Sequence, residues 1–203
     1  MKIVLFTVLA YLIGALPFGL LIARLKGVDI RKEGSGNIGA TNVFRVIGKG
    51  LGLFTLFLDI LKGFIPAFFF AQILDLNHDW RLLFGAAAIL GHTFPVYLKF
   101  KGGKGVATSA GMLLGAAPVA MGFGFVAWGI CMAISRYVSL SSIVAALTIA
   151  TTVWVRDEYQ QNRISQIVIT LLVVLVIWLH RTNIQRLLNG TESRMGRQKE
   201  DKS

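Results

Sequence analysis

Long apolar runs dominate the chain and restrict what it can fold into. Six are visible, at about 3–25, 51–74, 80–98, 106–134, 138–155 and 164–179. Roughly 20 apolar residues in a helix cross the hydrocarbon core of a bilayer. With 55% of its 203 residues hydrophobic, the chain is also too apolar for a soluble domain of this size. These runs predict an all-α polytopic membrane protein.

The first run could be a cleaved signal peptide or a membrane span. It continues to about Ala23 without a clear small-residue cleavage site. We therefore interpret it as a first span that stays in the protein.

The run at about 106–134 could be one long span or two short helices, because Pro118 lies near its middle. Basic residues distinguish the two, since they concentrate on the cytoplasmic side of a membrane. Two segments, 106–117 and 119–134, place sixteen of the twenty-one Lys and Arg residues on one side. The charge pattern therefore predicts seven transmembrane segments, with the N-terminus outside and the C-terminus cytoplasmic.

The chain shows no internal repeat or low-complexity linker, which predicts a single integral membrane domain over 1–190 and a polar cytoplasmic tail over 191–203. Its net charge of +11 fits either anionic lipid headgroups or an anionic substrate. The single cysteine, Cys131, excludes an intrachain disulfide.

Three polar motifs interrupt or follow the apolar runs. They are GSGNIGATNVFR at 34–45, GHTFPVYLKFKGGKGVAT at 91–108 and HRTNIQRLLNGTE at 180–192. Any one of them could be a turn or a topology signal. The predicted topology, however, brings all three to one membrane face, each with Lys or Arg beside Asn, Ser, His or Gly. That combination is typical of a phosphate site.

The GGKG sequence at 102–105 differs from the nucleotide-binding P-loop. A P-loop needs a glycine where this chain has Leu98, and a Ser or Thr where it has Gly105. Nucleotide binding therefore has no support. The glycines would instead let successive backbone N–H groups point at one phosphate, with Lys104 supplying charge.

Covalent and metal chemistry also find little support. The chain has no G-x-S-x-G, no H-x-x-x-x-D and no His and Asp cluster at metal-ligand spacing near the motifs. An enzyme of this sequence would work by binding and electrostatics. Inside a span, Asp59 and Lys62 share a helix face, and we expect them to pair or to reach toward the cytoplasmic loops. Their role could be structural or catalytic.

The three motifs closely resemble those of the PlsY family, bacterial inner-membrane enzymes that transfer an acyl group from acyl phosphate to glycerol 3-phosphate. The resemblance covers nearly the whole chain, and LDILKG at 58–63 also resembles the family. One departure is Leu179, where relatives often have a basic residue. The resemblance implies an acyltransferase of the bacterial inner membrane, with its active site at the cytoplasmic face. It would catalyse the first acylation of phospholipid synthesis and release lysophosphatidic acid and inorganic phosphate.

The resemblance also implies roles for individual residues. The catalytic set, which would bind glycerol 3-phosphate, is Ser35, Arg45, Lys104, His180 and Asn183. The acyl-phosphate head would be held by Gly36, Asn37, Gly39, Thr41 and Asn42 and by the amides of Gly102, Gly103 and Gly105, with His92 ordering the second-motif loop. The general base is either His180 or an oxygen of the substrate phosphate.

The implied partners are glycerol 3-phosphate, acyl phosphate and membrane lipids. Because the donor is an activated mixed anhydride, we expect no cofactor and no metal. We also expect no nucleic acid and no obligate protein partner. The alternatives are a transporter or channel for a phosphorylated metabolite and a lipid-surface scaffold. The first would favour charges at mid-membrane and internal symmetry, and the second would not need the Asn- and Gly-rich motifs.

Overall fold

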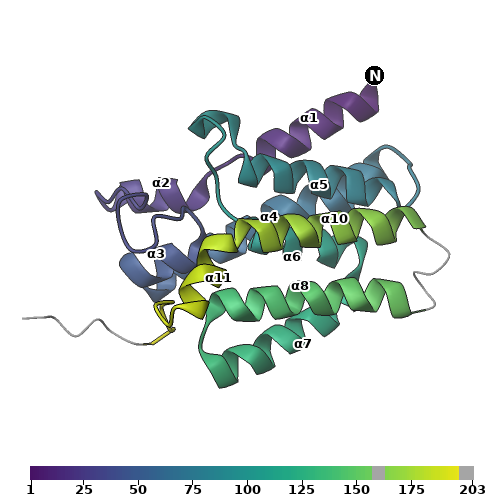
Figure 1. The fold of residues 1–203 in the computed structure, drawn as a ribbon. Coiled ribbons are helices and arrows are strands. Elements are labelled where there is room, and N and C mark those ends of the chain that lie inside the picture. Colours follow the sequence, from purple (N-terminus) through teal and green to yellow (C-terminus); the bar gives the residue numbers. More distant parts are fainter. Residues whose placement is uncertain (157–162, 197–203) are drawn as a thin grey trace, which may run out of the picture. The chain divides into compact units, whose positions relative to one another are not determined.

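The computed structural model describes residues 1–156 and 163–196, and the regular elements in that part of the chain are all helical (Figure 1). They are α1 (Lys2–Gly14), α2 (Phe18–Leu25), α3 (Ala40–Val46), α4 (Lys49–Ile73), α5 (Trp80–Thr93), the 3-10 turn η1 (Val96–Leu98), α6 (Val106–Ala116), α7 (Pro118–Ser135), α8 (Val138–Val155), α10 (Arg163–Leu179) and α11 (Arg181–Leu188). The all-α prediction is confirmed. Of the predicted tail, residues 197–203 lie outside the described residues.

Two compact units make up the chain, Met1–Pro118 and Val119–Ser203. The first holds the first and second motifs, and the second holds the third motif. The prediction of one domain over 1–190 stays a prediction.

Among the described residues, five helical stretches are long and apolar enough to cross a membrane: Lys2–Leu25, Lys49–Ile73, Trp80–Leu98, Pro118–Ser135 and Val138–Val155. A sixth arises if α10 and α11, which meet at a bend of 54°, form one span. Helix α6 has 11 residues, so it reaches only about 16 Å of a roughly 30 Å hydrocarbon core. Seven segments and the orientation of the termini therefore stay predictions.

The predicted break near Pro118 is confirmed. Helix α6 ends at Ala116, and Ala117 leaves the helical region with φ −151° and ψ 62°. Helix α7 then begins at Pro118, whose missing N–H has no cost in the first turn of a helix.

Small residues allow the helices of the first unit to approach closely. Helix α4 packs against both α5 and α6, and α1 packs along α5. A Cβ at Gly63 would collide with the carbonyl oxygen of Thr108, and one at Gly14 with that of Ala88. This is the packing expected of membrane helices, where close backbone contact replaces the hydrophobic effect.

The first span is broken between α1 and α2. Pro17 lies at the break and cannot continue the helical hydrogen bonds. The Leu16 carbonyl oxygen lies between the two helices, where it accepts the Phe18 N–H at 3.1 Å and a second bond from Lys62 Nζ of α4 at 2.8 Å.

Polar side chains join α8 and α10 in the second unit, where the two helices lie side by side (Figure 1). Gln166 Nε2 donates to the Val153 carbonyl oxygen at 3.0 Å, and Trp154 Nε1 donates to Thr170 Oγ1 at 2.9 Å. Such bonds hold apolar helices together where no water competes.

Candidate active site

The first motif forms a loop around the side chain of Asn42, which is 1% exposed. Asn42 Nδ2 lies 3.1, 3.0 and 2.9 Å from the carbonyl oxygens of Ile30, Glu33 and Asn37, so that its two N–H donors are shared among three acceptors. Its Oδ1 accepts the backbone N–H of Ser35 at 2.9 Å. A single amide thus satisfies four backbone groups of a segment that has no helical or strand partner.

The other predicted residues of this motif lie on or beside the same loop. Gly36 has φ 71°, a conformation that favours glycine. Asn37 Oδ1 accepts the N–H of Gly39 at 2.9 Å, just before α3 begins. Ser35 is exposed, whereas Thr41 and Arg45 are half-buried on α3. The loop therefore presents Ser35 while Asn37 and Asn42 shape it, and a contact of either Asn with acyl phosphate stays a prediction.

The glycines of the second motif pack against the end of α5. Gly102 N–H donates to the Thr93 carbonyl oxygen and Gly103 N–H to that of His92, both at 3.1 Å. A Cβ at Gly102 would collide with the His92 carbonyl oxygen, and one at Gly103 with the His92 ring. This differs from the prediction that both N–H groups point at a phosphate. In the structure the two glycines permit close packing, and their N–H groups are used within the loop.

The anion-binding features of the second motif lie directly after Gly103. Lys104 and Gly105, with φ 73°, lead directly into α6, whose first N–H groups and positive dipole end favour an anion. The hydroxyls of Thr93 and Thr108 are buried and have no hydrogen-bond partner within the described residues. Thr93 Oγ1 lies 3.3 Å from where a Cβ of Gly105 would be. The Lys104 cation, the start of α6 and the unpartnered Thr93 hydroxyl together suit a phosphate.

An apolar core connects the first and second motifs. Leu98 of the second motif packs against the buried cluster below the first-motif loop, formed by Leu20, Ile22, Ala23, Ile30, Ile38 and Val43. Both loops are therefore carried by one compact body.

A buried charge cluster lies beside the second motif. Lys62 Nζ is 2.6 Å from Asp59 Oδ1, and both side chains are 2% exposed. His92 Nδ1 lies 3.9 Å from the same oxygen. The expected pairing of Asp59 with Lys62 is confirmed. Across residues 1–156 and 163–196, no group of three or more His, Cys, Asp or Glu side chains could hold a metal ion.

The third motif is organised by Glu192, which is buried. Its Oε1 accepts bonds from Ser139 Oγ and Asn183 Nδ2, and its Oε2 accepts one from Arg186 Nε, all at 2.7 Å. Burial raises the pKa of this carboxyl, but the bonds from Arg186, Asn183 and Ser139 outweigh it and hold the pKa below its ordinary value. Asn183 is thereby fixed by a carboxylate.

His180 lies at the bend between α10 and α11 and is 3% exposed. Its Nδ1 is 2.8 Å from the Val176 carbonyl oxygen. Because a carbonyl can only accept, Nδ1 carries a proton, and whenever the ring is neutral Nε2 is the nitrogen with a lone pair. That tautomer can accept a proton from a hydroxyl.

Four residues near the motifs were not predicted to have a role. Glu192, Thr93 and Thr108 lie within the motif sequences, where a carboxylate or hydroxyl side chain was the signal available in the sequence. The structure adds that all three side chains are buried. Ser139 lies 53 residues from its partner Glu192, so only the fold could reveal it.

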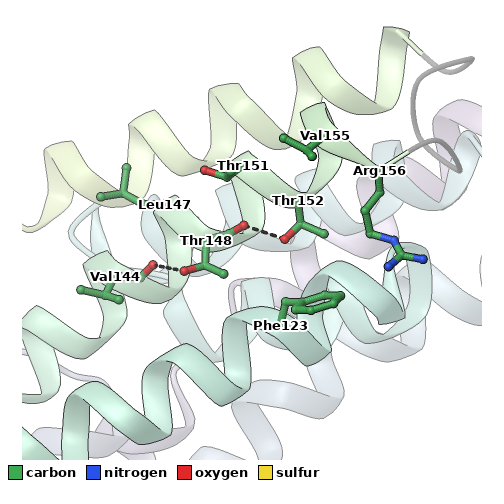
Figure 2. Close-up of a pocket in the computed structure, with 8 residues that line it drawn as sticks. All are labelled: Phe123, Val144, Leu147, Thr148, Thr151, Thr152, Val155 and Arg156. Carbon is green, nitrogen blue, oxygen red and sulfur yellow. Dashed lines mark hydrogen bonds between the residues drawn. The ribbon is translucent and has the colours of Figure 1, made fainter.

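A separate apolar groove of about 450 Å³ lies in the second unit, between α7 and α8 (Figure 2). Its lining is Phe123, Val144, Leu147, Thr148, Thr151, Thr152, Val155 and Arg156. Thr148 and Thr152 donate to carbonyl oxygens of their own helix, at 2.9 and 2.8 Å, so their hydroxyls are already used. None of the predicted site residues lines this groove, which we therefore separate from the active site.

Comparison with known sequences gives a consistent result. The family model for glycerol-3-phosphate acyltransferase matches residues 4–190. The glycerol-3-phosphate acyltransferase of Aquifex aeolicus is 44% identical over 195 residues, covering 96% of this chain and 100% of the relative. That of Syntrophotalea carbinolica is 47% identical over 187 residues, covering 91% and 93%.

Solved structures agree with the sequences. The crystal structure of PlsY, an integral membrane glycerol 3-phosphate acyltransferase, in its glycerol 3-phosphate form matches with a TM-score of 0.90 and 41% identity, over 97% of this chain and 96% of that one. Its lysophosphatidic acid form matches with a TM-score of 0.86. The motifs, the helical membrane fold and these matches lead to one conclusion: the chain belongs to the glycerol-3-phosphate acyltransferase (PlsY) family of integral membrane acyltransferases.

Proposed function

We propose that the protein transfers an acyl group from acyl phosphate to the 1-hydroxyl of glycerol 3-phosphate, yielding lysophosphatidic acid and inorganic phosphate. This would be the first acylation of phospholipid synthesis. One observation carries the choice of donor. Lys104 directly precedes Gly105, the N-cap of α6, and the buried Thr93 hydroxyl lies 3.3 Å from where a Cβ of Gly105 would be, which suits a phosphate leaving group.

The reaction needs no covalent enzyme intermediate. The hydroxyl oxygen of glycerol 3-phosphate attacks the acyl carbonyl carbon and forms the new ester bond. The bond between that carbon and the bridging phosphate oxygen breaks, and phosphate leaves with the electron pair. The hydroxyl proton goes to a phosphate oxygen or to His180 Nε2. The protein's part is to bring two anions together and to offset their charge.

Roles in the first unit follow from chemistry and position. Ser35 and Arg45 bind glycerol 3-phosphate, and Lys104 neutralises its phosphate and the leaving phosphate. Gly36, Gly39 and Thr41, with Asn37 and Asn42 shaping the loop, hold the acyl-phosphate head. The path of the second-motif loop depends on Gly102, Gly103 and Gly105. Of these three, Gly105 is the one whose backbone N–H we still propose as a donor to the acyl-phosphate head.

His180 and Asn183 are further residues for glycerol 3-phosphate, as their place in the family's third motif implies. The fixed positions of the two side chains support this assignment, since His180 Nδ1 is held by the Val176 carbonyl oxygen and Asn183 Nδ2 by Glu192.

We propose that the site lies at the cytoplasmic face of a bacterial inner membrane. The support is the charge asymmetry of the sequence, which favours seven segments with a cytoplasmic C-terminus. Glycerol 3-phosphate would then enter from the aqueous side, and the acyl tail would lie among the spans.

A choice between donors tests the proposal. The detergent-purified protein is given labelled glycerol 3-phosphate with palmitoyl phosphate, with palmitoyl-CoA, or with palmitoyl-acyl-carrier protein. Of the three donors, only palmitoyl phosphate should give labelled lysophosphatidic acid. Product from either thioester and none from the acyl phosphate would overturn the donor assignment, and no product from any donor would overturn the reaction.

A further inference from the structure

We propose that the buried Asp59–Lys62 pair is a positioning device that acts through His92 to fix the second-motif loop, and thereby sets the affinity for the two substrate phosphates that Lys104 neutralises. The inference deepens the proposed function and rests on it. Asp59 and Lys62 are positioning residues, since their side chains are 2% exposed and Asp59 approaches the second motif at His92.

The free-energy cost of burying the Asp59–Lys62 pair inside a span indicates that the pair has a role. Two ionised groups inside a membrane span carry a large desolvation penalty, and apolar residues of similar volume often stabilise a protein as well or better. A buried ion pair is therefore weak evidence of stability. It is better explained by the specific arrangement that it enforces.

Lys62 fixes the pair to the first span. Its Nζ donates to the Leu16 carbonyl oxygen at 2.8 Å, at the break before Pro17, and lies 5.4 Å from the centre of the Phe18 ring. Carboxylate, carbonyl and ring together surround the ammonium group. The position of Asp59 on α4 is thus tied to α1 and α2 as well.

Asp59 in turn faces the residue that carries the loop. Its Oδ1 lies 3.9 Å from His92 Nδ1, in the last turn of α5. The His92 carbonyl oxygen accepts the Gly103 N–H at 3.1 Å, and the His92 ring occupies the space that a Cβ of Gly103 would need. Contacts therefore run from the ion pair through one imidazole to the residue directly before Lys104.

The main test replaces the pair by apolar residues of similar volume, Asp59→Leu with Lys62→Met, so that no charge is left uncompensated. The matched control is Thr55→Val. Thr55 is buried one turn before Asp59 on the same helix, and its hydroxyl donates only to the Leu51 carbonyl oxygen of that helix, at 2.8 Å. It removes a buried polar group without touching the loop.

Two readouts separate positioning from plain stability. Amide hydrogen exchange of the peptide covering 99–106 should be about tenfold faster in the double variant, because the bonds to Thr93 and His92 loosen. The KM for palmitoyl phosphate and the KM for glycerol 3-phosphate should both rise about tenfold, because Lys104 serves the phosphates of both substrates. Thr55→Val should leave all three values near wild type.

A second variant keeps the test valid if the double variant does not fold. His92→Gln retains the Asp59–Lys62 pair. The side-chain amide of the introduced glutamine lies away from the position of His92 Nδ1, the atom that faces Asp59. It should show the same faster exchange and the same rise in both KM values.

Wild-type exchange and wild-type values of both KM constants in either folded variant would overturn the inference. If the wild-type protein makes no lysophosphatidic acid, the proposed function fails first. Loop exchange would still report whether the pair positions the loop.

Discussion

Asn42 and Glu192 each organise one motif through a single buried polar side chain, but with opposite chemistry. Asn42 is neutral and gathers four backbone groups of the first-motif loop, donating to three carbonyls and accepting from one N–H. Glu192 is ionised and gathers three side-chain donors around the third motif. Asn42 holds a loop that has no helix or strand ladder of its own, whereas Glu192 ties helix α11 to Ser139 of α8.

The local sequence explains the difference. The first motif is rich in glycine and offers backbone groups of both kinds, so only a side chain with donors and an acceptor can satisfy them. The third motif offers Asn and Arg side chains, and the partner Ser139 is also a donor; a carboxylate accepts from all three. The stabilisation by the neutral Asn42 should not depend on pH, whereas the stabilisation by the charged Glu192 should.

The largest effect is expected from Asn42→Asp. The change replaces the donating Nδ2 by a carboxylate oxygen that faces the carbonyl oxygens of Ile30, Glu33 and Asn37. Lost donors and repulsion should lower the free energy of unfolding by about 3 kcal/mol. Denaturant titration in detergent micelles measures it.

Asn189→Asp is the control, because Asn189 is exposed. A loss of stability no larger than that of the control would show that the first-motif loop does not depend on the Asn42 amide.

Glu192→Ala should have the next largest effect. It leaves Asn183, Arg186 and Ser139 without their shared acceptor, and it removes the ion pair with Arg186. The expected loss is about 2 kcal/mol in the same titration. Glu192→Gln, which keeps one acceptor oxygen, should lose less; an equal loss in both would mean that size rather than hydrogen bonding matters.

The two regions should also differ in their response to acid. Because the folded-state pKa of Glu192 lies below its ordinary value of 4.5, its stabilising contribution is complete above that value and is lost as the pH falls through the folded pKa. The stability difference between wild type and Glu192→Gln should therefore shrink as the pH is lowered. The difference between wild type and Asn42→Ala should stay constant over the same range.

Melting temperatures of the three proteins, followed from neutral pH to below the ordinary Glu value, measure this response. A difference for Glu192→Gln that does not change with pH would contradict an ionised Glu192.

The smallest effect is expected from Ser139→Ala. It removes one of three bonds to Glu192 and leaves the bond with Arg186, so the loss should be about 1 kcal/mol. Ser142→Ala is a close control, since the Ser142 hydroxyl donates to the Val138 carbonyl oxygen of its own helix. A larger loss in Ser142→Ala would show that Glu192 gains nothing specific from Ser139.

Much of the fold could be predicted, because helices in a membrane are long, apolar and locally encoded. The apolar runs gave the main helices, and Pro118 gave the break between α6 and α7. The short helices α3 and α11 were missed, because each lies in a segment whose polar composition indicated a loop.

The candidate site was predicted in its residues more than in its contacts. A glycine that permits close packing and a glycine that exposes its N–H to an anion look the same in a sequence, and Gly102 and Gly103 proved to pack closely. The partners of Asn42 likewise depend on the path of the loop. Neither could be obtained from local spacing.

Phosphate release tests the central claim most directly. Wild type, Lys104→Ala and Lys101→Ala are each given palmitoyl phosphate with and without glycerol 3-phosphate, and phosphate and lysophosphatidic acid are measured together. Lys101 is exposed in the same loop and is the control. We predict equal amounts of both products from wild type and Lys101→Ala, only with glycerol 3-phosphate, and a loss of at least about 100-fold in Lys104→Ala. Full turnover by folded Lys104→Ala would contradict the account.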